Sequence, residues 1–322
     1  MKTYSNGAKS SMLQRYSLNG ETMGTRYTAV FYAPEGSDVA AIGASLFFAV
    51  DKVDRQLSTW NPLSDLCRLN AGPENTWIAV PEALAHVVDT GVLIGRQSNG
   101  AFDIGVGEVV DAWGFGPSKQ ETRSQSMAVH ESRHRPASAI LEIDLAHRQV
   151  RKLAPIAIDL SGIAKGYGVD QLASCLEAWG VSRYLVGIDG EMRARGSKPG
   201  GKAWTVAIEK PTYGLREVSG VMELGDTAIA TSGDYRRWVD IKGKRYAHTI
   251  NPALQRPVSN RLAAVSVLAH TCMLADAWAT ALLVLGEREG IALARERCMD
   301  VLFVLRDGDS LQEVLILGGQ LV

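Results

Sequence analysis

The pattern that constrains the fold most is a series of short strand-like runs that meet their neighbours through glycine turns. "TRYTAVFYA" at 25–33 alternates apolar and polar residues, and similar runs occur later as "RYLVGIDGEMRARG", "AWTVAIEKP", "LAAVSVLAHTC" and "VLFVLRDGDSLQEVLIL". Alternation with period two is typical of strands, and turns this short join antiparallel neighbours. We therefore expect an α+β architecture with antiparallel or mixed sheets packed with helices.

Helical spacing of apolar residues appears between these runs. It is clear in "SDVAAIGASLFFAVDKVDRQLSTW" and in "VPEALAHVVDTGVLIGRQSNG", where Pro81 opens the helix and Gly100 follows its end. "LADAWATALLVLG" and "EREGIALARER" predict two further helices. A hairpin, "AILEIDLAHRQVRKLA", is expected to lead into a strand, "IAIDL".

The domain organisation predicted from the sequence is simple. Residues 1–20 form a polar N-terminal extension and 21–322 a single domain. Residues 118–137, "SKQETRSQSMAVHESRHRPA", contain little to bury and indicate an exposed insertion loop.

Composition excludes several function classes. Of the 322 residues, 46% are hydrophobic and 21% charged, as in soluble globular proteins, and the net charge of −1 gives no global case for nucleic acid. The four cysteines show no CxxC spacing, so a metal or disulfide framework is not expected. We find neither the apolar core of a secretory signal nor a membrane-length apolar run. The expectation is therefore a cytoplasmic protein, or a periplasmic one if an export leader precedes this chain.

The first candidate site is the turn in "IDLSGIAKGYGVDQLASCLEAWG", where three glycines and Lys165 fall at a helix start. Glycine weakens a helix by about 1 kcal/mol relative to alanine, so something must approach this backbone closely. A phosphate bound by the helix N-terminus and Lys165 is one explanation. A close-packed strand-to-helix turn with a surface lysine is the other.

The second candidate is the pair Asp276 and Thr280 in "LADAWATALLVLG". They lie four residues apart on one face of an otherwise apolar helix. A buried carboxylate is costly without a partner, and a carboxylate with a hydroxyl suits Mg²⁺. Alternatively, Asp276 caps a neighbouring segment and Thr280 bonds the preceding helical turn.

Two weaker candidates complete the set. His248, in "RYAHTINP", stands beside a turn and could accept a proton from an attacking hydroxyl, although a lone histidine is more often structural. The glycine- and aromatic-rich stretch around Asp103, with Trp60, Phe102 and Trp113, could wall a planar ligand. Aromatic residues more often belong to the core.

Taken together, these stretches resemble the FAD:protein FMN transferase family, the ApbE-type flavin transferases. The motifs occur in the family's order: "MGT", "DRQLSTWNPLSDLCRLN", "GAFDIGVGEVVDAWGFG", "IDLSGIAKGYGVDQLA", "WTVAIEKP", "AIATSGDYRRW", "RYAHTINP" and "ADAWATALLVLG". The resemblance runs from about residue 21 to 286. It implies an Mg²⁺-dependent enzyme that moves FMN from FAD onto a Ser or Thr hydroxyl of an acceptor protein, releasing AMP.

The resemblance also implies roles for particular residues. Asp276, Thr280 and the carbonyl of Gly162 would bind the metal, and His248, near the reacting phosphate, would be the base. The predicted FAD contacts are Met23, Trp60, Ala101, Phe102, Asp103, Asp159, Lys165 and His248.

Two departures from the family pattern bear on the acceptor rather than on these residues. Gln255-Arg256 replaces a usual Thr-Gly pair, and Ile188-Asp189-Gly190 replaces a usual Gly-Gly pair. Two other functions remain compatible with the sequence. One is an FAD pyrophosphatase, in which water replaces the acceptor, and the other is a non-catalytic FAD carrier.

Overall fold

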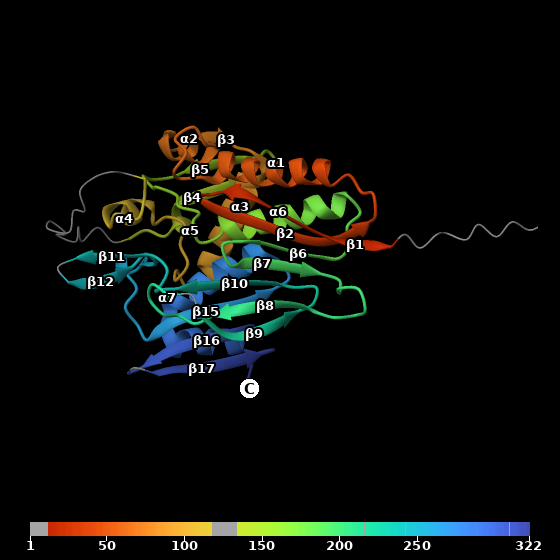
Figure 1. Cartoon of the computed structure of the whole chain (residues 1–322). Coiled ribbons are helices and arrows are strands. Elements are labelled where there is room, and N and C mark those ends of the chain that lie inside the picture. The colour runs from red at the N-terminus through yellow and green to blue at the C-terminus, as the bar shows by residue number, and fades with distance from the viewer. Residues whose placement is uncertain (1–11, 118–133, 216, 242, 309) are drawn as a thin grey trace, which may run out of the picture.

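The fold is built around one large sheet (Figure 1). A computed structural model describes residues 12–117, 134–215, 217–241, 243–308 and 310–322. The sheet has nine strands in the order β1-β2-β6-β7-β10-β15-β16-β17-β18, and each of its printed pairings is antiparallel. This confirms the predicted α+β class. The strands are β1 (Leu13–Thr22), β2 (Thr25–Pro34), β6 (Tyr184–Ile188), β7 (Glu191–Arg195), β10 (Ala228–Gly233), β15 (Leu262–Ala269), β16 (Asp300–Asp307), β17 (Ser310–Leu317) and β18 (Gln320–Leu321).

Smaller antiparallel sheets stand beside the large one. One has three strands in the order β3-β5-β4, and three are two-stranded: β8–β9, β11–β12 and β13–β14. Their bounds are β3 (Trp77–Ala79), β4 (Leu141–Asp144), β5 (Gln149–Lys152), β8 (Trp204–Glu209), β9 (Val218–Leu224), β11 (Trp238–Ile241), β12 (Lys244–Ala247), β13 (Ile250–Asn251) and β14 (Arg256–Pro257).

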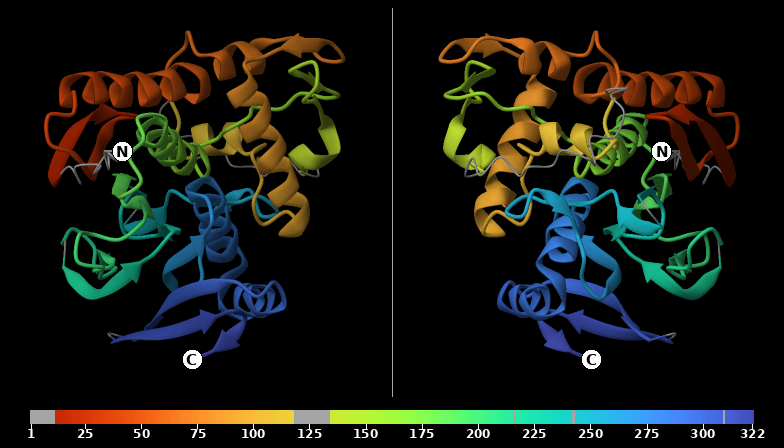
Figure 2. Two further views of the ribbon diagram at one scale, coloured as in Figure 1. Left: turned by 90° about the vertical axis from the view of Figure 1, so that its right-hand side faces the viewer. Right: turned by 90° about the vertical axis from the view of Figure 1, so that its left-hand side faces the viewer.

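Helices cover the large sheet and meet one another in the middle of the molecule (Figure 2). α6 packs on β6 and β7, α7 packs on β10 and β15, and α6 touches both α1 and α7. No helix among the described residues has both the length and the apolar character needed to cross a membrane. The helices are α1 (Val39–Leu57), α2 (Asp65–Ala71), α3 (Glu82–Gln97), α4 (Gly107–Ala112), α5 (Ala137–Ile140), α6 (Ala164–Ala178) and α7 (Cys272–Glu296).

The predicted helices are confirmed, and α1 shows why. Its buried residues recur every three or four positions, so they form one apolar stripe. The Asp38 carboxylate accepts the N–H of Ala41 and caps the first turn. The two helices predicted near the C-terminus also form, as parts of α7. Gly286 separates them with a φ of 80°, a left-handed conformation that suits glycine.

The buried apolar side chains form two large groups. One collects residues from α3, α7, β15 and β16, and the other from β2, β6, α1 and α6. The start of α6 lies where they meet, because Ile163 belongs to the first group and Val169 to the second. The glycine-rich turn is therefore held by both halves of the molecule.

Three segments differ from the sequence expectation or lie partly outside the described residues. The strand predicted at "IAIDL" is wrong: Ile158 and Asp159 donate their N–H groups to the Asn70 side chain and the Ile104 carbonyl instead of to a strand. Residues 13–20, assigned to a polar extension, belong to β1. The predicted insertion loop lies outside the described residues over 118–133, and α5 begins at its last residue, Ala137.

Candidate active site

The turn that opens α6 packs tightly against the start of α7. A Cβ atom on Gly166 would lie 2.3 Å from the carbonyl oxygen of Cys272 and 2.8 Å from Cβ of Asp276. Side chains do not approach backbone so closely, and only glycine permits this contact. Of the two explanations offered for the glycines of this turn, a bound phosphate or close packing, the structure therefore supports close packing at Gly166.

Gly162 occupies a different environment in the same turn. A Cβ atom here would lie 3.2 Å from the Phe102 ring and 3.3 Å from Oγ1 of Thr280. The Gly162 backbone is thus close to the Thr280 hydroxyl. Three segments that are distant in sequence, namely the loop at 101–103, the turn and α7, converge at this point.

Asp276 and Thr280 both face this turn from α7. The buried Asp276 carboxylate accepts the N–H of Gly166 at 2.9 Å. Burial raises the pKa of Asp276, and the charge of Lys165 and the Gly166 N–H oppose that rise. Thr280 Oγ1 lies 3.0 Å from the hydroxyl oxygen of Ser232 on β10.

Lys165 is held between acidic groups. Its Nζ donates to Oε1 of Glu191 at 2.7 Å and lies 3.9 Å from the Asp189 carboxylate. Burial lowers the pKa of Lys165, but the charges of Glu191 and Asp276 more than offset this, so its pKa lies above the usual value. The lysine is therefore a fixed cation in this site. Its orienting partner, Glu191, is 3% exposed and was missed by the sequence analysis.

A second missed carboxylate fixes α7 relative to α6. The buried Asp170, on α6, accepts the N–H groups of Cys272 and Met273 at 2.9 Å each. These are free N–H groups of the first helical turn of α7, so Asp170 satisfies them and favours the helix dipole. Arg193 on β7 donates to the same carboxylate at 2.7 Å. Asp170 thus helps to set where Asp276 lies.

His248 directly follows β12 and faces the same cavity. Its Nδ1 lies 3.3 Å from the carbonyl oxygen of Arg237, which also accepts the His248 backbone N–H. Burial, with a contribution from the Lys165 charge, lowers the pKa of His248 to about 4. The imidazole is therefore neutral at ordinary pH. If Nδ1 carries the hydrogen and donates to Arg237, Nε2 is left free to accept a proton.

These groups line one cavity of about 750 Å³, within the usual range for small-molecule sites. Ser232 also lines the cavity, as do four charged residues that were not predicted as site residues: Asp189, Glu191, Arg236 and Arg237. The structure brings every residue predicted to bind FAD or metal to this cavity: Met23, Trp60, Ala101, Phe102, Asp103, Asp159, Gly162, Lys165, His248, Asp276 and Thr280. Trp113, which was also a candidate wall for a planar ligand, is not among the lining residues, and its ring packs 5.2 Å from the Tyr246 ring.

Two of the predicted FAD contacts, Asp103 and Asp159, also stabilise the loops around them. The Asp103 carboxylate accepts N–H groups from Gly105 and Ala137 and pairs with Nε2 of His134 at 2.7 Å, which ties two loops together. Asp159 accepts the N–H of Ser161 at 2.8 Å and shapes the glycine turn. Burial raises the pKa of Asp159, and this hydrogen bond opposes the rise.

The donor set around Gly162 fits a hard cation. It offers a buried carboxylate from Asp276, a hydroxyl from Thr280 and a nearby peptide group. Mg²⁺ prefers oxygen ligands and keeps several of its waters or substrate phosphates, so few protein ligands suffice. Within the described chain no three His, Cys, Asp or Glu side chains converge as a metal cluster. The donors therefore favour a magnesium-type site over a zinc-type site.

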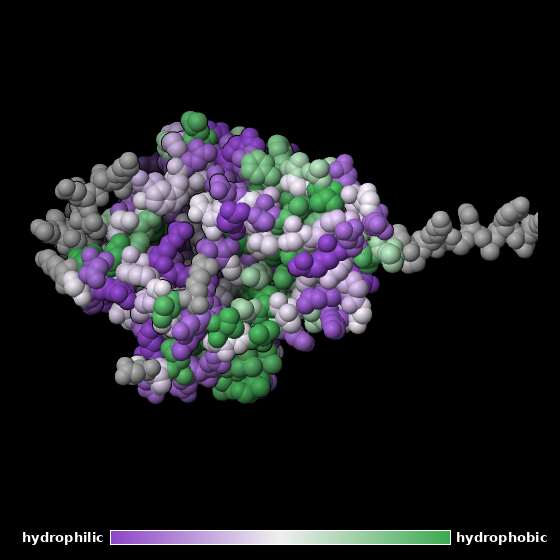
Figure 3. Space-filling model, in the orientation of Figure 1, coloured by the Kyte–Doolittle hydropathy of each residue, from purple (hydrophilic) through white to green (hydrophobic). Residues whose placement is uncertain are grey.

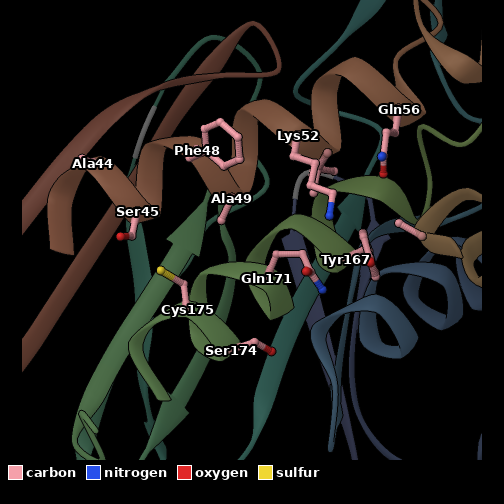
Figure 4. A pocket seen from close by; sticks show the side chains of 12 residues that line it. Ala44, Ser45, Phe48, Ala49, Lys52, Gln56, Tyr167, Gln171, Ser174 and Cys175 are labelled. Atoms are coloured by element: carbon pink, nitrogen blue, oxygen red, sulfur yellow. The ribbon is translucent and has the colours of Figure 1, made fainter. Parts of the chain in front are cut away.

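A second groove lies between α1 and α6 (Figure 4). Its walls are mostly small or amide side chains, with Phe48, Lys52 and Tyr167 among them. Burial raises the pKa of the Cys175 thiol there, which makes it a poor nucleophile. We place the candidate active site in the larger cavity.

Comparison with known proteins identifies the family. The profile of the ApbE family matches residues 23–303. The chain belongs to the ApbE family. Among curated members, the Vibrio cholerae protein named FAD:protein FMN transferase is 37% identical over 300 residues, covering 92% of this chain and 89% of the relative. The Escherichia coli K12 protein of the same name is 35% identical over 297 residues, covering 91% and 85%.

Solved ApbE structures share the fold over almost the whole chain. The flavin transferase ApbE from Vibrio cholerae aligns with a TM-score of 0.84 at 35% identity, covering 95% of this chain and 98% of that one. The apo flavinyl transferase ApbE from Pseudomonas stutzeri gives 0.85 at 32% identity, covering 96% and 98%. The predicted family is confirmed.

Proposed function

We propose that this ApbE protein transfers FMN from FAD to a Ser or Thr hydroxyl of an acceptor protein and releases AMP. The observation that carries this is the name FAD:protein FMN transferase on relatives 35–37% identical over about nine-tenths of the chain. The cavity supports it, because it gathers a fixed cation, a buried carboxylate and a neutral histidine around space for a dinucleotide.

The reaction exchanges one phosphoester bond for another. The acceptor oxygen bonds to the phosphorus on the riboflavin side of FAD, and the bond from that phosphorus to the bridging oxygen breaks. AMP leaves with the bridging oxygen, and the product is FMN joined to the acceptor by a phosphodiester. The hydroxyl proton must leave the acceptor oxygen during attack.

Residues of the cavity supply the groups that this transfer and the removal of the hydroxyl proton require. Lys165, oriented by Glu191, presents its ammonium group to the phosphates. His248 takes the hydroxyl proton on Nε2, while the Arg237 carbonyl holds the ring through Nδ1. Asp276, Thr280 and the Gly162 carbonyl would hold Mg²⁺, which when bound stabilises negative charge on the phosphate oxygens. Trp60, more than half exposed at the cavity, is placed to cover a bound ring.

The test uses the purified protein with FAD and Mg²⁺, alone and with candidate acceptors. Mass spectrometry of co-expressed candidates should find an added FMN on a Ser or Thr, and AMP should appear in equal amount. AMP release at the same rate with and without every acceptor would refute transfer and favour FAD hydrolysis. FAD binding without AMP release would favour a carrier.

A further inference from the structure

One segment near the active site is far more basic than the rest of the chain. Residues 236–256 contain six Lys or Arg and one Asp, a net charge of +5, whereas the whole chain has a net charge of −1. This segment contains the β11–β12 hairpin, which leads directly into His248. Figure 3 shows hydrophilic side chains over this hairpin, at the left of the molecule.

Three cations define what we call the basic hairpin: Arg237, Lys244 and Arg245. All three are exposed, and none forms an ion pair with a carboxylate in the part of the chain that the structure describes. The neighbouring Arg236, by contrast, is neutralised by Glu209 at 2.6 Å and by Asp189. The charge of the basic hairpin is therefore available to a partner.

Aromatic rings hold two of these cations, Lys244 and Arg245, in place. The Arg245 guanidinium stacks 4.3 Å from the Tyr213 ring and 4.8 Å from the Trp238 ring. Lys244 lies 5.2 Å from the Tyr246 ring on the opposite face of the hairpin. Such contacts orient a cation while leaving its N–H groups free to donate.

FAD can account for Arg237 but not for the other two cations of the basic hairpin. The cavity wall already includes Lys165, Arg236 and Arg237, which can serve the two phosphates of FAD. Lys244 and Arg245 lie outside the cavity wall, four and three residues before His248 respectively. At about 3.3 Å per strand residue they lie about 10–13 Å along the chain from the proposed base.

We propose that the basic hairpin is the docking surface for the acceptor protein and that it binds acidic residues near the modified Ser or Thr. This inference rests on the proposed function, since it identifies the second substrate by its charge. An extended acceptor segment with the same rise per residue would carry its acidic side chains about three or four residues from the reacting hydroxyl. Complementary charge would speed encounter and fix register.

The binding test does not depend on catalysis. A fluorescent peptide with one threonine and aspartates three and four residues away is compared with its asparagine counterpart. Wild-type protein should bind the acidic peptide about tenfold more tightly at low salt, and salt should remove the difference. Equal binding of the two peptides would overturn the proposal.

Substitutions test whether Lys244 and Arg245 cause the preference for the acidic peptide. Lys244→Glu with Arg245→Glu should abolish the preference for the acidic peptide. Lys244→Arg with Arg245→Lys keeps both charges and should preserve it. The matched control is Arg288→Glu with Arg295→Glu, which changes the net charge equally on the exposed surface of α7 and should also preserve it. Loss of the preference in the control, or its survival in the first double variant, would refute the assignment.

A transfer assay separates this inference from the proposed function. With an acceptor that wild-type protein modifies, the Lys244→Glu, Arg245→Glu variant should raise KM for the acceptor about tenfold and leave KM for FAD within about twofold. An unchanged acceptor KM would refute the docking surface alone. Binding of this surface to phosphatidylglycerol vesicles, without preference between the peptides, would overturn the proposal in favour of a membrane partner.

Discussion

Replacing Gly166 by alanine should damage both stability and the site. The new Cβ would lie 2.3 Å from the Cys272 carbonyl oxygen, and an ordinary contact requires at least 3.4 Å. The start of α7 must therefore move away from α6 by about 1 Å, in an interior that is close-packed. A shift of this size would also break the 2.9 Å hydrogen bond from the Gly166 N–H to Asp276.

The expected cost follows from these two effects. Overpacking costs about 1–3 kcal/mol, and a lost hydrogen bond to a charged group about 1.5–3 kcal/mol. Alanine favours the helix over glycine by about 1 kcal/mol, which offsets part of these two costs. The free energy of unfolding should therefore fall by about 1.5–5 kcal/mol. Denaturant unfolding followed by circular dichroism measures this change.

Gly43 in α1 is the matched control for this prediction. A Cβ atom there meets only Leu18, at an ordinary 3.6 Å, so Gly43→Ala should stabilise the protein by about 0.5–1 kcal/mol. If Gly166→Ala proved as stable as Gly43→Ala, the close approach of α6 and α7 would be refuted. Magnesium-dependent AMP release should also fall in Gly166→Ala and stay unchanged in Gly43→Ala.

Three further substitutions test the proposed roles. Asp276→Ala should abolish magnesium-dependent AMP release and lower the free energy of unfolding by about 1–3 kcal/mol, because the buried Gly166 N–H loses its acceptor; normal turnover would refute the assignment of Asp276 to the metal. His248→Ala should slow transfer by about 10²–10⁴-fold, and NMR titration of wild-type protein should show the His248 ring neutral until the pH approaches 4, whereas an inflection near 6.5 would contradict its burial. Glu191→Gln should raise KM for FAD, because Lys165 loses its charged partner; an unchanged KM with unchanged kcat would show that Lys165 needs no orientation.

The sequence predicted the cavity wall well because its motifs are local. Each predicted residue sits in a short stretch whose turn or helix spacing is visible on its own, as with Asp276 and Thr280 one helical turn apart. The resemblance to a known family then placed these stretches in one site, which composition and periodicity could not do.

The missed residues depend on contacts between distant segments. Asp170 caps a helix that begins 102 residues later, and nothing near "GYGVDQL" indicates that partner. Glu191 shares its position in the polar and apolar alternation of "EMRAR" with Arg193 and Arg195, so the sequence pattern indicated an exposed acid and not the buried one that the structure shows. "IAIDL" failed as a strand because its backbone groups found a side chain and a loop carbonyl as partners.

The hydrogen bond between Gly166 and Asp276 joins residues 110 positions apart, and this has a consequence for folding. The chain cannot assemble its catalytic centre until nearly all of it has been synthesised, since α7 must dock before α6 is capped. A nascent or truncated chain ending before α7 would lack that centre even if the first half were already ordered. Substrate bound there would oppose local opening of either half, and hydrogen exchange should slow at the starts of both helices together.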